Sequence, residues 1–162
     1  MSDDFSSVKS LADATPELMN KLSEGTFTDL LGLKYTEMSG DGVSAEWVVT
    51  PQQFQPAGIV NGGVYCTVIE TLASVAAGVW LGERGTVVGV NNNTDFLRAV
   101  REGKLTGVAS PIHRGRSQQL WVVVISDEQG RTVGARSGAV ADPLPAGLTT
   151  RTEWSATIKT GW

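Results

Sequence analysis

The chain has 162 residues, enough for one domain with its own core, and 41% of them are hydrophobic, which argues against disorder. Its formal net charge of −4 favours neither nucleic acid nor an anionic membrane as a partner. One cysteine and one histidine exclude a disulfide framework and the common zinc sites, so we expect no metal.

The chain is expected to be cytoplasmic, with no membrane partner. No uninterrupted apolar run reaches the roughly 18 to 20 residues that a bilayer span needs. The N-terminus is acidic and has no apolar stretch behind it, so no signal peptide is expected.

Residues 1–25 are predicted to form an N-terminal extension with one short helix. Thr15 followed by Pro16 is typical of a helix start, with an N-cap residue and a proline at the first helical position. The helix should end near Gly25, because glycine commonly follows the last helical residue.

Two strands and a loop are predicted next. Leu33–Ser39 and Val43–Val49 are separated by Gly40-Asp41-Gly42, which is a hairpin signal. Pro51–Val60 carries two prolines and a glycine and is therefore predicted to be a loop.

The segment Gly62–Trp80 is apolar on almost every face, which is typical of a buried helix. Four β-rich runs with short, glycine-containing connections then predict an antiparallel meander: Thr86–Arg98, Leu105–His113, Gln119–Ser126 and Thr132–Ala141. The prediction is an α+β fold in which an antiparallel sheet wraps around one long buried helix. We assign residues 26–142 to this domain and residues 143–162 to a C-terminal tail.

One carboxylate interrupts the apolar helix. Thr67, Glu70, Thr71 and Ser74 have the spacing that places them on one helical stripe. An ionised carboxylate in an apolar surrounding must be paired, protonated or placed at a site, and no lysine or arginine lies within a turn of Glu70. We interpret Glu70 as a ligand-facing carboxylate; the alternative is an anchor that faces a strand arginine or a subunit contact.

The start of the helix offers hydrogen-bond donors. Asn61 is a good N-cap residue, and Gly62 and Gly63 allow another group to approach the backbone closely. Free N–H groups at the positive end of the helix dipole suit a polarised carbonyl or a developing oxyanion. With Glu70 two turns away, the pattern predicts an electrophile and a base; an ordinary capped helix start is the alternative.

These residues also match the signature of a known family. The run Gln55-Pro56-Ala57-Gly58-Ile59-Val60-Asn61-Gly62-Gly63, with Glu70 and Ser74 behind it, resembles hotdog-fold acyl-CoA thioesterases. It is similar in particular to the group that contains the phenylacetate-pathway, Arthrobacter-type 4-hydroxybenzoyl-CoA and 1,4-dihydroxy-2-naphthoyl-CoA thioesterases. Val88–Arg98 and Pro111–Gln119 resemble a strand and a later loop of that group.

The resemblance implies a hotdog fold and hydrolysis of acyl-CoA thioesters to a free acid and CoA. Aryl-CoA substrates such as hydroxybenzoyl-CoA or 1,4-dihydroxy-2-naphthoyl-CoA are expected, without a metal or redox cofactor. Members of the group assemble as dimers or as dimers of dimers, so a homotetramer is one expected form. Each site is then built at a subunit interface from both chains.

The resemblance also implies residue roles. Glu70 is the catalytic carboxylate, as nucleophile or as general base on water. The Gly62 N–H polarises the thioester carbonyl, Gln55 orients the acyl group or the water, and Ser74 forms a hydrogen bond near Glu70 or the leaving group. Asn61 stands where the family usually has histidine; asparagine can cap the helix and donate a hydrogen bond, but it cannot shuttle a proton.

Further residues are expected to bind the substrate. Gly63 and Thr71 neighbour the predicted catalytic groups on the helix. Arg114, Arg116 and Ser117 lie in a loop that in relatives is near the nucleotide part of coenzyme A, and two arginines beside a serine suit phosphate. A solvated turn is the alternative for each of these three.

Two other functions remain open on sequence alone. A hotdog hydratase or dehydratase needs a catalytic histidine at the mouth of the helix, whereas the single histidine, His113, lies in a late strand. A non-catalytic or weakly active acyl-CoA-binding hotdog protein would explain Asn61 in place of histidine. Hydrolysis of any aryl-CoA distinguishes the thioesterase from the binding protein.

Overall fold

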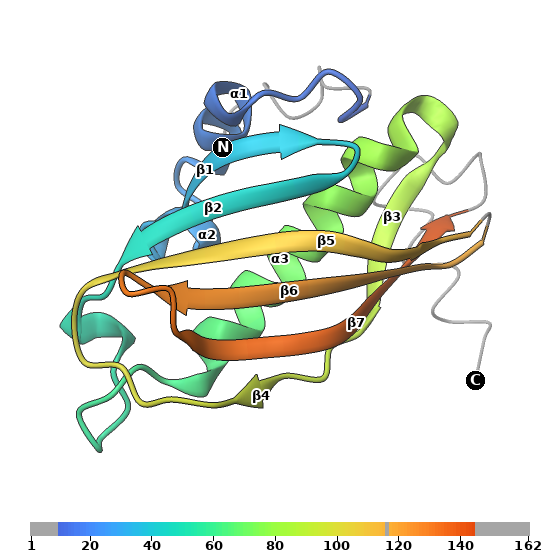
Figure 1. Ribbon diagram of the computed structural model, residues 1–162. Coiled ribbons are helices and arrows are strands. Elements are labelled where there is room, and N and C mark those ends of the chain that lie inside the picture. Colours follow the sequence, from blue (N-terminus) through green and yellow to red (C-terminus); the bar gives the residue numbers. More distant parts are fainter. Residues whose placement is uncertain (1–9, 116, 145–162) are drawn as a thin grey trace, which may run out of the picture.

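A computed structural model describes residues 10–115 and 117–144, in which an antiparallel sheet curves over one side of a central helix (Figure 1). Arg116 and the tail from residue 145 onward, which the sequence analysis singled out, lie outside the described residues. The helices are α1 (Pro16–Ser23), α2 (Phe27–Leu30) and α3 (Gly62–Leu81), with short 3-10 turns η1 (Pro51–Gln53) and η2 (Gly82–Arg84). The strands are β1 (Lys34–Ser39), β2 (Gly42–Val48), β3 (Thr86–Asn91), β4 (Asp95–Phe96), β5 (Lys104–Arg114), β6 (Gln119–Asp127) and β7 (Thr132–Leu144).

The sheet has the strand order β1-β2-β5-β6-β7-β3, and each pair of neighbours is antiparallel. The predicted meander is confirmed for β5, β6 and β7. The prediction that β3 precedes β5 in the same meander is wrong, because β2 pairs with β5 and β3 lies beside β7 at the edge of the sheet. The described part of β7 also continues past the predicted end, to Leu144.

The predicted strand Thr86–Arg98 is broken into two. β3 ends at Asn91 and β4 covers only Asp95–Phe96, with a polar run of low β-propensity between them. The side chain of Asn92 donates a hydrogen bond of 2.8 Å to the carbonyl oxygen of Cys66 on α3, so this run is tied to the helix.

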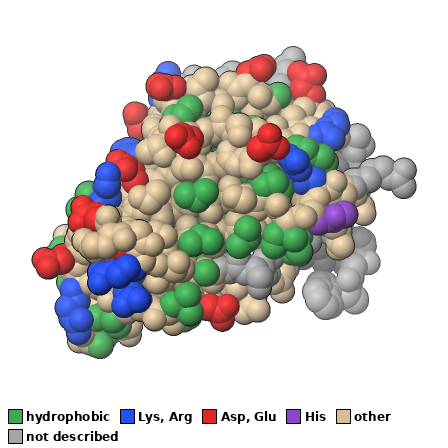
Figure 2. Space-filling view, viewed as in Figure 1, with side chains coloured by type: hydrophobic (Ala, Val, Ile, Leu, Met, Phe, Trp, Pro, Cys, Tyr) green, Lys and Arg blue, Asp and Glu red, His purple; other side chains and the backbone are tan. Residues whose placement is uncertain are grey.

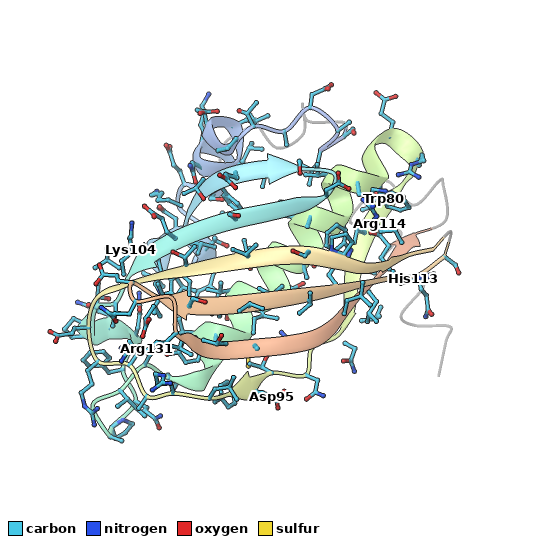
Figure 3. All side chains as sticks on the ribbon, in the orientation of Figure 1. Trp80, Asp95, Lys104, His113, Arg114 and Arg131 are labelled. Carbon is cyan, nitrogen blue, oxygen red and sulfur yellow. The ribbon has the colours of Figure 1, made fainter. Side chains whose placement is uncertain are left out.

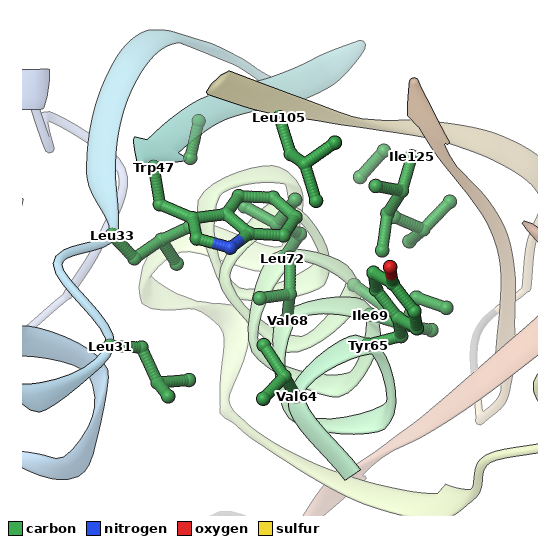
Figure 4. Packing of buried hydrophobic residues seen from close by; sticks show 14 of the residues in the cluster. Leu31, Leu33, Trp47, Val64, Tyr65, Val68, Ile69, Leu72, Leu105 and Ile125 are labelled. Atoms are coloured by element: carbon green, nitrogen blue, oxygen red, sulfur yellow. The ribbon is translucent and has the colours of Figure 1, made fainter. Parts of the chain in front are cut away.

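The core lies between α3 and the inner face of the sheet (Figure 4). The largest fully buried apolar side chains come from α3, from the strands around it and from the segment before β1: Trp47, Trp121, Leu33, Ile69, Leu72, Leu105 and Ile125. The helix approaches β5 so closely that a Cβ added to Gly107 would lie 2.7 Å from Leu72 Cδ1. Burying a side chain such as Leu72 stabilises the fold by about 1.5 to 3 kcal/mol.

Both predicted helix starts are confirmed by their caps. Thr15 Oγ1 accepts a hydrogen bond from the Leu18 N–H, and Asn61 Oδ1 accepts one from the Gly63 N–H. By length and composition alone, the stretch Gly62–Arg84 could cross a membrane, although Glu70 interrupts its apolar run. Half of its most apolar stretch of 18 residues is buried inside the protein, as is usual for a core helix.

Candidate active site

The start of α3 presents an open N–H group. The Asn61 N–H donates to the Gln53 carbonyl oxygen at 2.8 Å, and Asn61 Oδ1 accepts from the Gly63 N–H at 2.8 Å. The cap therefore uses the Gly63 N–H. The Gly62 N–H has no hydrogen-bond partner among the described residues. Gly62 is thus the better placed of the two glycines to bind a carbonyl oxygen.

A pocket of about 390 Å³ opens at this helix start. Gln55, Gly62, Tyr65, Phe96 and Arg98 lie in its wall. A Cβ added to Gly62 would lie 2.9 Å from the tip of the Phe96 ring, so glycine is the residue that leaves this ring in place over the helix end. The side-chain amide of Gln55 makes no hydrogen bond to the described residues and is available to a ligand.

Glu70 lies at a second position, two turns along α3. Its side chain is exposed in the single chain, and Ser74 Oγ donates a hydrogen bond of 2.8 Å to Glu70 Oε1. Gly89 of β3 faces this carboxylate, because a Cβ added there would lie 2.7 Å from Glu70 Oε1. Glu70 has no ion-pair partner among the described residues. The alternative interpretation, in which Glu70 anchors the fold by pairing with a strand arginine, is therefore not observed in this part of the chain.

Two other residues of the polar stripe behave differently. Thr67 Oγ1 donates to the Gly63 carbonyl oxygen at 2.9 Å, which closes a local bond within the helix. Thr71 is half-buried on the same stripe, between Glu70 and Ser74 in sequence. The stripe thus contains one carboxylate held by one hydroxyl, rather than a network of four polar groups.

An apolar pocket of about 360 Å³ adjoins Ser74. Its walls come from the segment before α1, from α1, from α3 and from the start of β3: Leu11, Met19, Leu22, Val75, Gly78 and Val87. Leu11 Cδ1 would lie 2.9 Å from a Cβ added to Gly78, so the N-terminal segment packs against a notch in the helix. An apolar cavity therefore lies next to the hydroxyl that holds Glu70.

Tyr35 is a buried residue near this carboxylate that the sequence analysis missed. Burial, and in second place the negative charge of Glu70, raise the pKa of Tyr35 to about 12. Its hydroxyl therefore stays protonated at neutral pH. Gly89 was also missed, although an isolated glycine in a strand pattern is a recognised sign of close approach to its backbone.

The predicted electrophile and base, Gly62 and Glu70, lie at two separate places on α3. Eight residues of α-helix separate them by about 12 Å along the axis and by roughly 80° around it. A thioester carbon within reach of one group is therefore out of reach of the other in the same chain.

Arg114 lies at the opposite end of the molecule from the start of α3 (Figure 3). Its Nη1 donates to the Gly40 carbonyl oxygen at 2.7 Å and to Asp41 Oδ1 at 2.8 Å, and its guanidinium carbon lies 5.7 Å from the centre of the Trp80 ring. The structure thus uses Arg114 to join β5 to the β1–β2 turn. Ser117 is exposed nearby, and no group of three or more potential metal ligands occurs among the described residues.

The chain is similar in sequence to known esterases and thioesterases. The sequence profile of the thioesterase superfamily matches residues 57–134. The chain is 53% identical over 110 residues to the candidate esterase Rv1847 of Mycobacterium tuberculosis, covering 66% of this chain and 79% of that protein. It is 38% identical over 117 residues to the proofreading thioesterase EntH of Cronobacter turicensis, covering 72% and 85%.

The chain also superposes on solved structures of thioesterases. Thioesterase HI1161 of Haemophilus influenzae superposes with a TM-score of 0.77 at 32% identity, over 85% of this chain and 94% of that one. A mutant form of thioesterase PA1618 of Pseudomonas aeruginosa superposes with a TM-score of 0.73 at 28% identity, over 80% and 95%.

Proposed function

Because this chain belongs to the thioesterase superfamily and is a thioester hydrolase with the hotdog fold, we propose that it cleaves acyl-CoA thioesters with Glu70 as the catalytic carboxylate. The observation that carries the proposal is the hydrogen bond of 2.8 Å from Ser74 to Glu70, beside an apolar pocket. A charged group held in one orientation next to a cavity is suited to act on a substrate bound there.

The Gly62 N–H is the group that polarises the thioester carbonyl. It is unpaired in the described part of the chain and lies at the positive end of a helix of 20 residues. As the tetrahedral intermediate forms, negative charge develops on the carbonyl oxygen, and an N–H already in position stabilises it without reorganisation. Gln55, which shares the pocket, orients the acyl group or the attacking water.

The active site combines two copies of the chain. Because Gly62 and Glu70 of one helix cannot reach the same carbon, Glu70 of one copy acts on a thioester held at Gly62 and Gln55 of a second copy. β3 is an edge strand of the sheet and Gly89 places it next to Glu70, so an interface along β3 would bring a second copy to this carboxylate. The proposed assembly is a homodimer or a dimer of such dimers.

Two chemical routes fit this arrangement. In one, Glu70 removes a proton from water while the water oxygen bonds to the thioester carbon; the intermediate then collapses and releases the CoA thiol with that proton. In the other, a Glu70 oxygen attacks the carbon and expels the thiolate, and water hydrolyses the resulting anhydride. The Ser74 hydroxyl orients the carboxylate in both routes.

The apolar pocket beside Ser74 supports a compact, mainly apolar acyl group. Its walls carry Met19, Leu22, Val75 and Val87, and its volume of about 360 Å³ is sufficient for one or two aromatic rings. Aryl-CoA thioesters of the hydroxybenzoyl and dihydroxynaphthoyl type are therefore the proposed substrates.

The test is release of free thiol from a panel of CoA thioesters: hydroxybenzoyl, phenylacetyl, dihydroxynaphthoyl and hexanoyl. The aryl thioesters are expected to give the highest kcat/KM. A preference for hexanoyl-CoA would contradict the aryl assignment, and wild-type rates in Glu70→Gln would contradict the role of Glu70. Glu83→Gln, which removes an exposed carboxylate from η2, is the matched control.

A further inference from the structure

Three residues at intervals of four lie close to one face of α3 and lead from the candidate carboxylate toward the end of the helix: Glu70, Ser74 and Gly78. Ser74 Oγ donates a hydrogen bond to Glu70 Oε1, and Gly78 lies one turn further on. Ser74 and Gly78 are both in the wall of the apolar pocket of about 360 Å³. The pocket therefore continues along the helix from the carboxylate and its hydroxyl.

The lining of this pocket suits an uncharged, apolar group. Its walls carry no charged side chain among the described residues, and their polar side chains are the hydroxyls of Ser10, Ser74 and Thr86. The end of the molecule where α3 begins differs, because Lys and Arg side chains gather there next to Asp and Glu side chains (Figure 2). The acyl part of a thioester, rather than a charged part of the substrate, therefore fits this pocket.

The segment before α1 forms one wall of the pocket and fills a notch in the helix. A Cβ added to Gly78 would lie 2.9 Å from Leu11 Cδ1, and one added to Gly82, the C-cap of α3, would lie 3.3 Å from Ala12 Cβ. Leu11 is half-buried and packs against the hydrophobic core. Its side chain therefore occupies the space that a side chain at position 78 would otherwise take, one turn beyond Ser74.

The segment that carries Leu11 is held in place. The Leu11 carbonyl oxygen accepts a hydrogen bond of 3.1 Å from the Ala14 N–H. The helix that follows, α1, is attached to the edge strand β1 through Asn20, whose side chain accepts from the Tyr35 N–H at 2.8 Å and donates to the Tyr35 carbonyl oxygen at 3.1 Å. Leu11 is thus a fixed part of the pocket wall.

We propose that Leu11 limits the length of the acyl group that the enzyme accepts. The proposal rests on the proposed function, because this length is measured from the thioester carbon at Glu70. Gly78 lies eight residues beyond Glu70, which is about 12 Å along the helix axis. An acyl group that extends along this face of α3 therefore meets the Leu11 side chain within about two turns. A compact ring system fits, whereas a substituent directed at Leu11 is obstructed.

The experiment compares two CoA thioesters, benzoyl-CoA and 4-propylbenzoyl-CoA, whose three additional carbons equal the three that Leu11→Ala removes. The measured quantity is the ratio of kcat/KM for the propyl thioester to kcat/KM for benzoyl-CoA. Leu11→Ala is expected to raise this ratio by about tenfold or more, the discrimination that one methylene group supplies in an apolar pocket. Leu11→Val, which removes one carbon and keeps more of the packing, should give a smaller increase. Leu30→Ala, which truncates an exposed leucine of α2 outside the pocket walls, is the control and should keep the wild-type ratio.

A compensating variant tests whether the volume over Gly78 is the cause. Leu11→Ala combined with Gly78→Val moves three carbons from the segment to the helix. The added side chain fits, because a Cβ at position 78 would lie 4.0 Å from Leu11 Cβ, which is an ordinary contact. The double variant should return the ratio to near the wild-type value. A ratio that stays raised would indicate a loosened segment instead and would overturn the proposal.

Two further results would overturn the role of Leu11. An unchanged ratio in Leu11→Ala and Leu11→Val, with benzoyl-CoA still hydrolysed, would do so and leave the acyl-CoA thioesterase proposal standing. Hydrolysis of neither thioester by the wild-type protein would overturn both.

Discussion

The two ends of the molecule use the same residue types in opposite ways. At the end where α3 finishes, Arg84 donates to the carbonyl oxygens of Leu81 and Trp80, and Arg114 is bonded to Gly40 and Asp41. At the end where α3 begins, the Gly62 N–H and the guanidinium groups of Arg98 and Arg101 have no partner among the described residues. Polar groups that are already paired hold the fold together, and unpaired ones beside a cavity are available to a substrate.

The largest expected effect comes from Glu70→Gln. The amide is nearly the same size, so the fold should be kept, but it can neither accept a proton nor act as a nucleophile. We expect kcat to fall by about 10²- to 10⁴-fold on the best aryl-CoA. Steady-state kinetics, with the melting temperature as a measure of folding, test this; an unchanged kcat would remove Glu70 from the mechanism.

Gly62→Pro should have the next largest effect. Proline is well tolerated at the first position of a helix, so the substitution removes the N–H with little effect on α3. Loss of one oxyanion donor is expected to lower kcat by about 10²- to 10³-fold. Gly62→Ala is the matched control, because it adds the same Cβ against the tip of the Phe96 ring and keeps the N–H. Equal losses in the two variants would indicate a packing effect instead.

Asn61 should affect both stability and rate, by smaller amounts. Asn61→Ala removes the cap to the Gly63 N–H and should destabilise the fold by about 1 kcal/mol and slow turnover. Asn61→His restores the usual residue of the family; if that histidine contacts the thioester, kcat/KM should rise roughly tenfold, and if it only shapes the loop, kcat/KM should stay within about twofold. Wild-type rate and melting temperature in Asn61→Ala would show that Asn61 has neither role.

Arg114→Gln should have the smallest effect. Its partner Asp41 is exposed, so the lost ion pair is expected to cost less than about 1 kcal/mol of stability. Because this end of the molecule serves the fold, KM for acyl-CoA should not change. Thermal unfolding measures the loss of stability, and steady-state kinetics of the same sample measure KM. A raised KM for acyl-CoA with unchanged stability would show that Arg114 binds substrate and does not serve the fold.

The chain's two tyrosines report on the folded state. Burial raises the pKa of Tyr35 and of Tyr65 to about 12 each, from an ordinary value of 10.0. Because burial favours the neutral form, the stabilisation is complete below pH 10 and is lost as pH rises through the folded-state pKa. Tyrosinate absorbance should therefore stay low at pH 10 in the native protein and in the variants above. Titration with a midpoint near pH 10 would show that these side chains are not buried.

Local sequence patterns predicted much of the fold. Asn61 before an apolar run predicted the helix start to the residue, and the spacing of Glu70 and Ser74 predicted that they share a helical stripe, which the hydrogen bond between them confirms. These features depend on residues a few positions apart, where periodicity and capping are decisive.

Features that depend on distant parts of the chain were not predicted. The pairing of β2 with β5 and that of β3 with β7 join residues far apart in the chain, which no local pattern records. Arg98 was expected to be an ordinary strand residue. Its place in the wall of the pocket at Gly62 depends on the hydrogen bond that its N–H donates to the Val133 carbonyl oxygen, and on the one from the Val60 N–H to the Val100 carbonyl oxygen. The separation of about 12 Å between Gly62 and Glu70 along α3 follows from the helical rise and is therefore available from the sequence alone.

The central claim, that one site takes Gly62 from one copy and Glu70 from another, is tested most directly by complementation. Co-expression of Glu70→Gln with Gly62→Pro, each nearly inactive alone, should give mixed dimers in which one of two sites has both wild-type groups. With random pairing, the account predicts recovery of about one quarter of wild-type activity. Co-expression of Glu70→Gln with Glu70→Ala is the control and should recover none. Activity in the first mixture no higher than the sum of the separate variants would contradict the shared site.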